Sequence, residues 1–159
     1  MSRRTGFTLI ELSIAIFIIA MLLALCAPAF VRSYNDMQLR EAARTFATTC
    51  QYGRILAVEH QTNAVLHIDL DRQKFWLTQN AGEAGDVTLK NYDLSVRVTL
   101  AGAELVDGPG KAERVIEVNF YRNGTCDSAT VVFRGEQKTG LAATIDPVTC
   151  KAVPYAVKL

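Results

Sequence analysis

The sequence predicts an α+β fold in which one long N-terminal helix packs on antiparallel β-sheets, with the first half of the helix crossing a membrane. Three observations support this prediction. Residues 12–31 carry no charge, residues 32–61 repeat apolar side chains at helical spacing, and residues 62–159 alternate apolar and polar side chains. At 159 residues, the chain has room for one globular domain and one terminal element.

The apolar run near the N-terminus has the length of a membrane-spanning helix. It covers 20 residues, from Leu12 to Val31, which is about what a helix needs to cross the hydrocarbon core. Arg3 and Arg4 precede the run, so the positive-inside rule places the N-terminus in the cytoplasm and the rest of the chain outside it. The alternative is a cleavable signal peptide, but its apolar region would be shorter and would not contain Glu11.

Glu11 is the only charged residue between Arg4 and Arg32. Thr8-Leu9-Ile10-Glu11 fits a capping box, in which Thr8 caps the helix start and Glu11 reaches back to it. A buried acid also needs a partner, because insertion costs about 2.5–3.5 kcal/mol at the bilayer centre. The helix itself offers no basic residue for this role, so a partner on another chain is the second interpretation.

The stretch "GFTLIEL", with its short basic leader and the apolar span, resembles the class III signal of type IV pilins and type II secretion pseudopilins. The resemblance implies a pilin-like fold and a prepilin peptidase that removes the leader, Met1 to Gly6. Phe7 then becomes the N-methylated terminus. In a filament, the Phe7 ammonium of a neighbouring subunit would pair with Glu11. Pro28 also matches the pattern and is expected to kink the helix rather than end it.

Residues 7–31 are thus expected to form the transmembrane half of the helix, and residues 32–61 its amphipathic half. The apolar side chains of the second half recur three and four residues apart, and we expect them to pack on a sheet: Leu39, Ala43, Phe46, Cys50, Gly53 and Ala57. Residues 62–159 form the predicted β-rich periplasmic domain of about seven short strands. The clearest strands cover residues 64–70, 94–100, 116–120, 129–133, 141–145 and 152–157. Asn123-Gly124 is predicted to be a hairpin turn.

Four cysteines are present. Cys126 and Cys150 lie in the strand-rich tail, and we expect them to form a disulfide if this tail reaches an oxidising compartment. Two reduced, buried thiols are the alternative. Cys50 belongs to the apolar stripe of the helix and is interpreted as a small core residue. No CxxC spacing is present, so the sequence does not support a zinc site or a redox motif.

Composition and motifs argue against an enzyme, a cofactor and a nucleic-acid partner. The 17 Lys and Arg residues nearly balance the 16 Asp and Glu residues, whereas binding to nucleic acid relies on positive charge. No serine lies in a nucleophile elbow, and no glycine-rich loop has the phosphate-binding form. His67, Asp69 and Asp71 alternate on a polar strand face, which could indicate a metal site. Three polar positions on a solvated strand need no metal, however.

The tail resembles the GspH/FimT minor pseudopilins, in the segments "IEVNFYRNGTCDSATVVF" and "GLAATIDPVTCKAV". One departure is that Cys150-Lys151 replaces the usual glycine-bearing turn. The resemblance implies a minor pseudopilin, a structural subunit of the type II secretion pseudopilus that helps to export folded proteins across the outer membrane. Its location would be the bacterial inner membrane, with one span, a cytoplasmic N-terminus and a periplasmic domain assembled in a filament.

The implied partners are a prepilin peptidase, other pseudopilins or pilins through the N-terminal helix, an inner-membrane assembly platform and membrane lipid. The alternative function is that of a minor type IV pilin involved in pilus assembly or DNA uptake. Binding of DNA would need an exposed basic patch, but the basic residues of the tail are scattered among acids: Arg134, Lys138, Lys151 and Lys158. A third possibility is a membrane-anchored domain that forms no filament.

Overall fold

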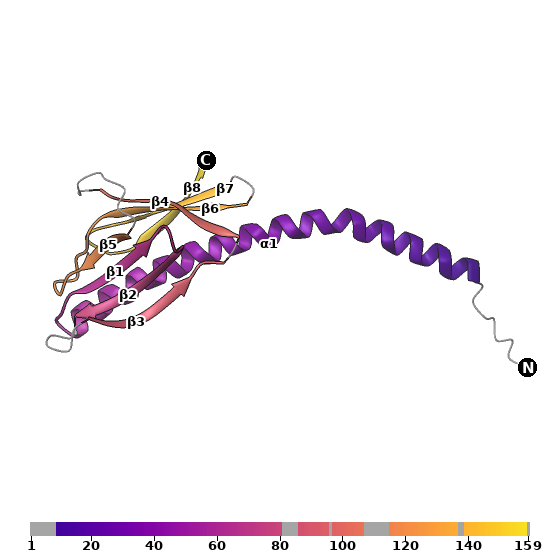
Figure 1. Cartoon of the computed structure of the whole chain (residues 1–159). Coiled ribbons are helices and arrows are strands. Elements are labelled where there is room, and N and C mark those ends of the chain that lie inside the picture. The colour runs from indigo at the N-terminus through magenta and orange to yellow at the C-terminus, as the bar shows by residue number, and fades with distance from the viewer. Residues whose placement is uncertain (1–8, 81–85, 96, 107–114, 137–138, 159) are drawn as a thin grey trace, which may run out of the picture. The chain divides into compact units, whose positions relative to one another are not determined.

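The computed structural model describes residues 9–80, 86–95, 97–106, 115–136 and 139–158. One long helix, α1 (Leu9–Glu59), is followed by eight strands, as Figure 1 shows. The chain divides into two compact units, residues 1–34 and 35–159. The predicted α+β class, with a long N-terminal helix and antiparallel sheets, is confirmed.

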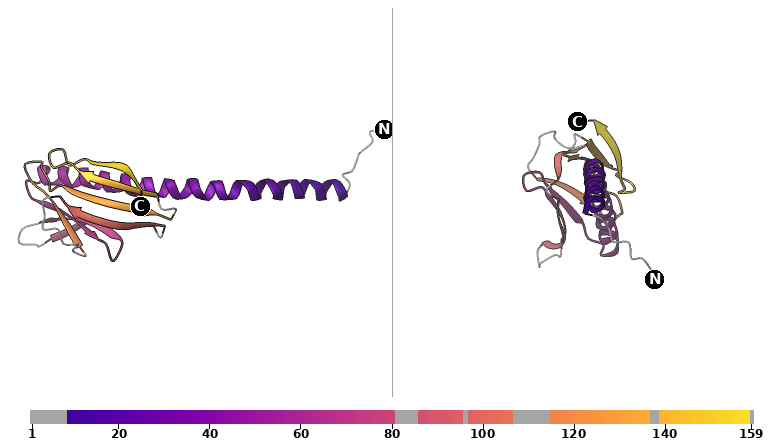
Figure 2. Two further views of the ribbon diagram at one scale, coloured as in Figure 1. Left: turned by 90° about the horizontal axis from the view of Figure 1, so that it is seen from above. Right: turned by 90° about the vertical axis from the view of Figure 1, so that its right-hand side faces the viewer.

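The strands form two antiparallel sheets of four strands each. Sheet 1 has the order β3-β2-β1-β5, and sheet 2 has the order β4-β6-β7-β8. Sheet 1 consists of β1 (Ala64–Asp69), β2 (Lys74–Asn80), β3 (Asp86–Asp93) and β5 (Val115–Phe120). Sheet 2 consists of β4 (Val98–Leu105), β6 (Ala129–Gly135), β7 (Thr139–Ile145) and β8 (Ala152–Lys158). Figure 2 shows the C-terminal half of α1 lying along the sheets.

The C-terminal half of α1 joins the two sheets through one apolar stripe. The predicted stripe is confirmed, because Leu39, Ala43, Phe46, Cys50 and Ala57 are all buried. The Phe46 ring packs edge-on against Phe75 of sheet 1 and Phe133 of sheet 2, with 5.6 Å between ring centroids in both pairs. Phe46 is therefore the residue at which helix and both sheets meet.

Gly53 lets α1 approach sheet 1 closely. A Cβ atom at this position would lie 2.9 Å from Cδ2 of Phe120 and 3.1 Å from Cδ1 of Leu77. Both side chains are fully buried, so neither is free to move away. Glycine is thus required here by the space between helix and sheet rather than by the backbone conformation.

Several predicted strands are confirmed, and one predicted strand begins later than expected. The strand predicted over residues 94–100 begins only at Val98, because the chain turns there after β3, with the Val98 amide donating to the Ser95 carbonyl at 2.9 Å. The turn at Asn123-Gly124 is present, with the Gly124 amide donating to the Tyr121 carbonyl at 2.9 Å. It closes a short hairpin, with the Tyr121 amide donating to the Thr125 carbonyl at 2.8 Å and the Asp127 amide to the Asn119 carbonyl at 3.0 Å. After a single bridge between Phe120 and Cys126, the chain crosses from sheet 1 to sheet 2.

Candidate functional site

The N-terminal part of α1 is apolar all around and exposed. Every large apolar side chain from Leu9 to Leu23 is more than half exposed, and Phe17 reaches 70%. A helix without a polar face is normally covered by lipid or by other helices. This part of the chain therefore requires a partner surface that lies outside its own fold.

The residues predicted from the N-terminal motif lie at the start of this helix. Glu11 is in the first turn of α1, where an acid faces the positive end of the helix dipole. Gly6, Phe7 and the predicted cap Thr8 lie outside the described residues. Pro28 lies within the continuous helix, and the predicted kink stays a prediction. Within the described part of the chain, no helix meets the combined length and hydrophobicity of a membrane-spanning segment.

The described cysteines gather in the core of the second unit. Cys50 of α1, Cys126 after β5 and Cys150 before β8 are all buried, and the structure holds them as free thiols. Burial raises the pKa of all three thiols, a charge on Cys150 raises the pKa of Cys50 and Cys126 further, and Cys126 and Cys150 share a side-chain hydrogen bond. The fold thus brings Cys126 and Cys150 together, as the predicted disulfide requires. The bond itself stays a prediction.

Two helix side chains hold the loops that carry Cys126 and Cys150. Arg54 donates from Nε to the Gly124 carbonyl at 3.0 Å and from Nη1 to the Thr149 carbonyl at 3.3 Å. Gln51 donates from Nε2 to the Cys150 carbonyl at 2.8 Å. This role of Arg54 could not be predicted from the sequence, because hydrogen bonds to distant carbonyls leave no spacing signal.

The loop before Cys150 is also fixed by its own residues. One carboxylate oxygen of Asp146 accepts hydrogen bonds from the amides of Val148 and Thr149, at 3.0 and 2.7 Å, and from the Thr149 hydroxyl. These bonds, led by those from Thr149, hold the pKa of Asp146 below its usual value. Cys150 itself has a positive φ of 51°, a left-handed conformation that non-glycine residues adopt rarely.

The polar strand face considered for a metal site has other uses in the structure. Oδ1 of the buried Asp69 accepts hydrogen bonds from the amides of Asp71 and Arg72, at 3.0 and 2.8 Å, and so closes the turn between β1 and β2. His67 contacts Glu117 and Thr78 instead. Among the described residues, no group of three or more His, Cys, Asp or Glu side chains could hold a metal ion.

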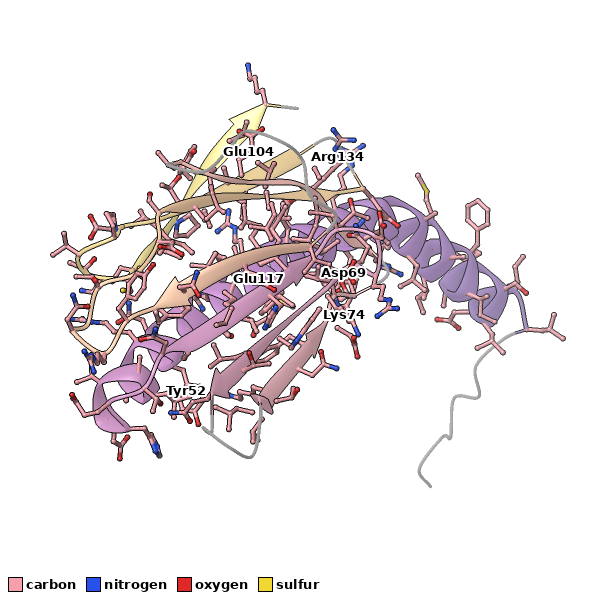
Figure 3. All side chains as sticks on the ribbon, turned by 60° about the vertical axis from the view of Figure 1, so that its left-hand side comes forward. Tyr52, Asp69, Lys74, Glu104, Glu117 and Arg134 are labelled. Carbon is pink, nitrogen blue, oxygen red and sulfur yellow. The ribbon has the colours of Figure 1, made fainter. Side chains whose placement is uncertain are left out.

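The charged residues of the two sheets are spread over separate strands. Figure 3 shows Asp69, Lys74 and Glu117 on sheet 1, and Glu104 and Arg134 on sheet 2. Of the four basic tail residues considered for DNA binding, Arg134, Lys151 and Lys158 are exposed, and Lys138 lies outside the described residues. Arg134 belongs to β6 and Lys158 to β8, with β7 between them.

Two kinds of known protein resemble this chain, one in a sequence motif and one in fold. The family described as "Prokaryotic N-terminal methylation motif" matches residues 1–27. The chain is also similar to a structure of the minor pseudopilin EpsH from the type 2 secretion system of Vibrio cholerae. The TM-score is 0.58 at 12% identity, over 76% of this chain and 97% of that chain. This chain has a pilin-like fold.

A second structure of EpsH matches the pilin-like chain with a TM-score of 0.57 and 11% identity, over 76% of this chain and 93% of that chain. A structure of the type IV minor pilin FimU of Pseudomonas aeruginosa matches with a TM-score of 0.49 and 20% identity. The match covers 77% of this chain and 90% of that chain. By sequence, no curated protein matches significantly. The methylation motif implies processing by a prepilin peptidase and assembly with other pilin-like chains.

Proposed function

We propose that this pilin-like chain is a minor pseudopilin, a structural subunit of a type II secretion pseudopilus that helps to export folded proteins across the outer membrane. The observation that carries the proposal is the combination of an N-terminal methylation motif with the fold of EpsH. EpsH is a minor pseudopilin of a type 2 secretion system. In this role the chain acts by assembly, and we propose no catalytic residue and no cofactor for it.

In the proposed mechanism, the peptidase cuts between Gly6 and Phe7, and the new Phe7 amine is methylated. The apolar segment over residues 7–31 anchors the chain in the inner membrane, and residues 62–159 form the periplasmic domain. The support for the anchor is the uncharged run from Leu12 to Val31. The same segment later forms the filament core, where lipid contacts are exchanged for contacts with other helices at the assembly platform.

Glu11 sets the register between subunits in this mechanism. A carboxylate in an apolar filament core is costly unless it meets a cation, and the Phe7 ammonium of a neighbour is such a cation. A shift of one helix turn would leave both charges unpaired. The pair therefore selects one axial offset between neighbouring helices, while the exposed apolar side chains of α1 supply the contact area.

Substitution at Glu11 tests this proposal. We expect Glu11→Ala and Glu11→Gln to be cut and methylated normally but to fail to restore secretion in a strain that lacks the chromosomal copy. Ser13→Ala is the matched control, because Ser13 bonds only the Leu9 carbonyl of its own helix, at 2.9 Å. Normal secretion by Glu11→Ala would contradict the filament role and favour an anchored domain that does not assemble.

The alternative role, in a type IV pilus, would give a different phenotype when the gene is deleted. A minor pilin of a DNA-uptake system would leave secretion unchanged when deleted and would reduce transformation or pilus number. Direct binding of DNA would appear as salt-sensitive retention of duplex DNA by the purified chain. Retention at low salt together with normal secretion in the deletion strain would replace the pseudopilin proposal.

A further inference from the structure

His67 lies on the outer face of sheet 1, and both of its ring nitrogens have a partner. Nδ1 is 3.2 Å from Oε1 of Glu117 on β5, and Nε2 is 2.9 Å from Oγ1 of Thr78 on β2. The ring stacks on Trp76, with 5.1 Å between centroids and 12° between planes. Only 16% of the His67 side chain is exposed. The imidazole is thus held in one place by partners on both neighbouring strands.

These partners determine the tautomer of neutral His67. A neutral imidazole has one N–H group, and the Glu117 carboxylate can only accept a hydrogen bond, so the proton belongs on Nδ1. Nε2 is then an acceptor, and the Thr78 hydroxyl must donate to it. The same hydroxyl oxygen lies 3.4 Å from the Val65 carbonyl. A hydroxyl has one proton, so donation to His67 prevents donation to Val65.

Protonation of His67 reverses this arrangement. Both ring nitrogens of an imidazolium are donors, so Nε2–H donates to the Thr78 oxygen. The Thr78 proton is then free to turn toward the Val65 carbonyl. At the same time, the contact with Glu117 becomes a charge-assisted hydrogen bond, and a cation comes to lie over the indole of Trp76.

We propose that His67 is a proton-operated switch on the outer face of sheet 1. Uptake of one proton from solvent at Nε2 reverses the His67–Thr78 hydrogen bond and redirects the Thr78 hydroxyl to the Val65 carbonyl. The switch joins β1, β2 and β5, and it uses none of the residues assigned to filament assembly. It therefore goes beyond the proposed function and does not depend on it.

The charged groups around His67 come from four strands. Glu117 of β5 contacts the ring directly, and Asp69 follows two residues later on β1 but is engaged in its own turn. On β2, the Lys74 ammonium lies 5.1 Å from the Trp76 ring centroid. On β3, Asp93 pairs with Lys74 in the strand register. Among these groups, Glu117 is the one in direct contact with the His67 ring.

The single tryptophan of the chain provides a direct test. A protonated imidazole stacked on an indole quenches its fluorescence, so the emission of Trp76 should fall reversibly on acidification from about pH 8 to pH 5. The full chain in detergent micelles is suitable, with circular dichroism recorded on the same samples. We expect the fall in the wild type and a constant emission in His67→Gln. An emission that is constant in the wild type, or falls equally in His67→Gln, would overturn the proposal.

Nuclear magnetic resonance on the same chain tests whether the Thr78 hydroxyl changes its hydrogen-bond acceptor. At neutral pH, the ¹⁵N spectrum should show a protonated Nδ1 and an unprotonated Nε2 for His67. The ¹³C resonance of the Val65 carbonyl should shift with the same pH midpoint as the His67 nitrogens in the wild type and in Thr78→Ser. It should stay constant in Thr78→Val. The opposite tautomer, or a Val65 carbonyl that does not respond in the wild type, would refute the switch without any variant.

Discussion

Replacement of Phe46 tests whether one helix side chain joins both sheets of the domain. Phe46 is fully buried, and its ring makes edge-on contacts with Phe75 and Phe133, one in each sheet. Truncation of a buried phenylalanine to alanine costs about 3–5 kcal/mol. For a domain of this size, each kcal/mol corresponds to about 3–4 °C. We therefore expect Phe46→Ala to lower the melting temperature by roughly 10–20 °C.

The assay is thermal and urea unfolding of the full chain in detergent, followed by circular dichroism. Val148→Ala is the control, because this side chain is 68% exposed, and it should change the free energy of unfolding by less than about 0.5 kcal/mol. Double-mutant cycles of Phe46→Leu with Phe75→Leu and with Phe133→Leu should each give a coupling of about 0.5–1.5 kcal/mol. A loss of unfolding free energy below about 1 kcal/mol for Phe46→Ala would show that Phe46 does not join both sheets, and so would coupling to one sheet only.

Three further changes test other parts of the fold. Gly53→Ala should lower the free energy of unfolding in urea, because the new Cβ would press against Phe120. This loss should exceed the advantage of about 1 kcal/mol that alanine has over glycine in a helix. A more stable variant would contradict this packing. Arg54→Ala should cost about 1–3 kcal/mol through the loss of its two hydrogen bonds to the Gly124 and Thr149 carbonyls, whereas the exposed Arg44→Ala should be neutral. The native Asp146 pKa is lowered, so the contribution of this carboxylate to stability is complete above its unfolded-state pKa of about 4 and is lost as pH falls through the native pKa. Asp146→Asn should remove this part of the pH dependence of the free energy of unfolding. An unchanged pH profile in this variant would disprove the contribution.

The helix and most strands could be predicted because their signals are local. The apolar stripe of α1 has a helical period, and strands such as β1 and β5 have a period of two, so burial follows directly from spacing. The boundary between β3 and β4 was missed because the alternation of Leu94, Val96 and Val98 fits a strand as well as a loop. The crossing from sheet 1 to sheet 2 after Asn123-Gly124 was missed because a turn sequence does not specify the partner of the next strand.

The N-terminal methylation motif could be predicted because its residues are contiguous. Gly6, Phe7 and Glu11 lie within one short motif, and the order of leader, junction and span carries the signal. The proximity of Cys126 and Cys150 was predicted, but the addition of Cys50 to this cluster was not, because Cys50 comes from a helix distant in the sequence. The same holds for His67 and its partners on β2 and β5, which only the strand register brings together.

The central claim is that the N-terminus of this pilin-like chain is processed for assembly. The most direct measurement is intact-mass and N-terminal analysis of the chain purified from its host, with and without an active prepilin peptidase. We expect a mature chain that begins at N-methylated Phe7 when the peptidase is active and at Met1 when it is not. A chain that keeps residues 1–6 in both cases, or is cut after the apolar run, would contradict it.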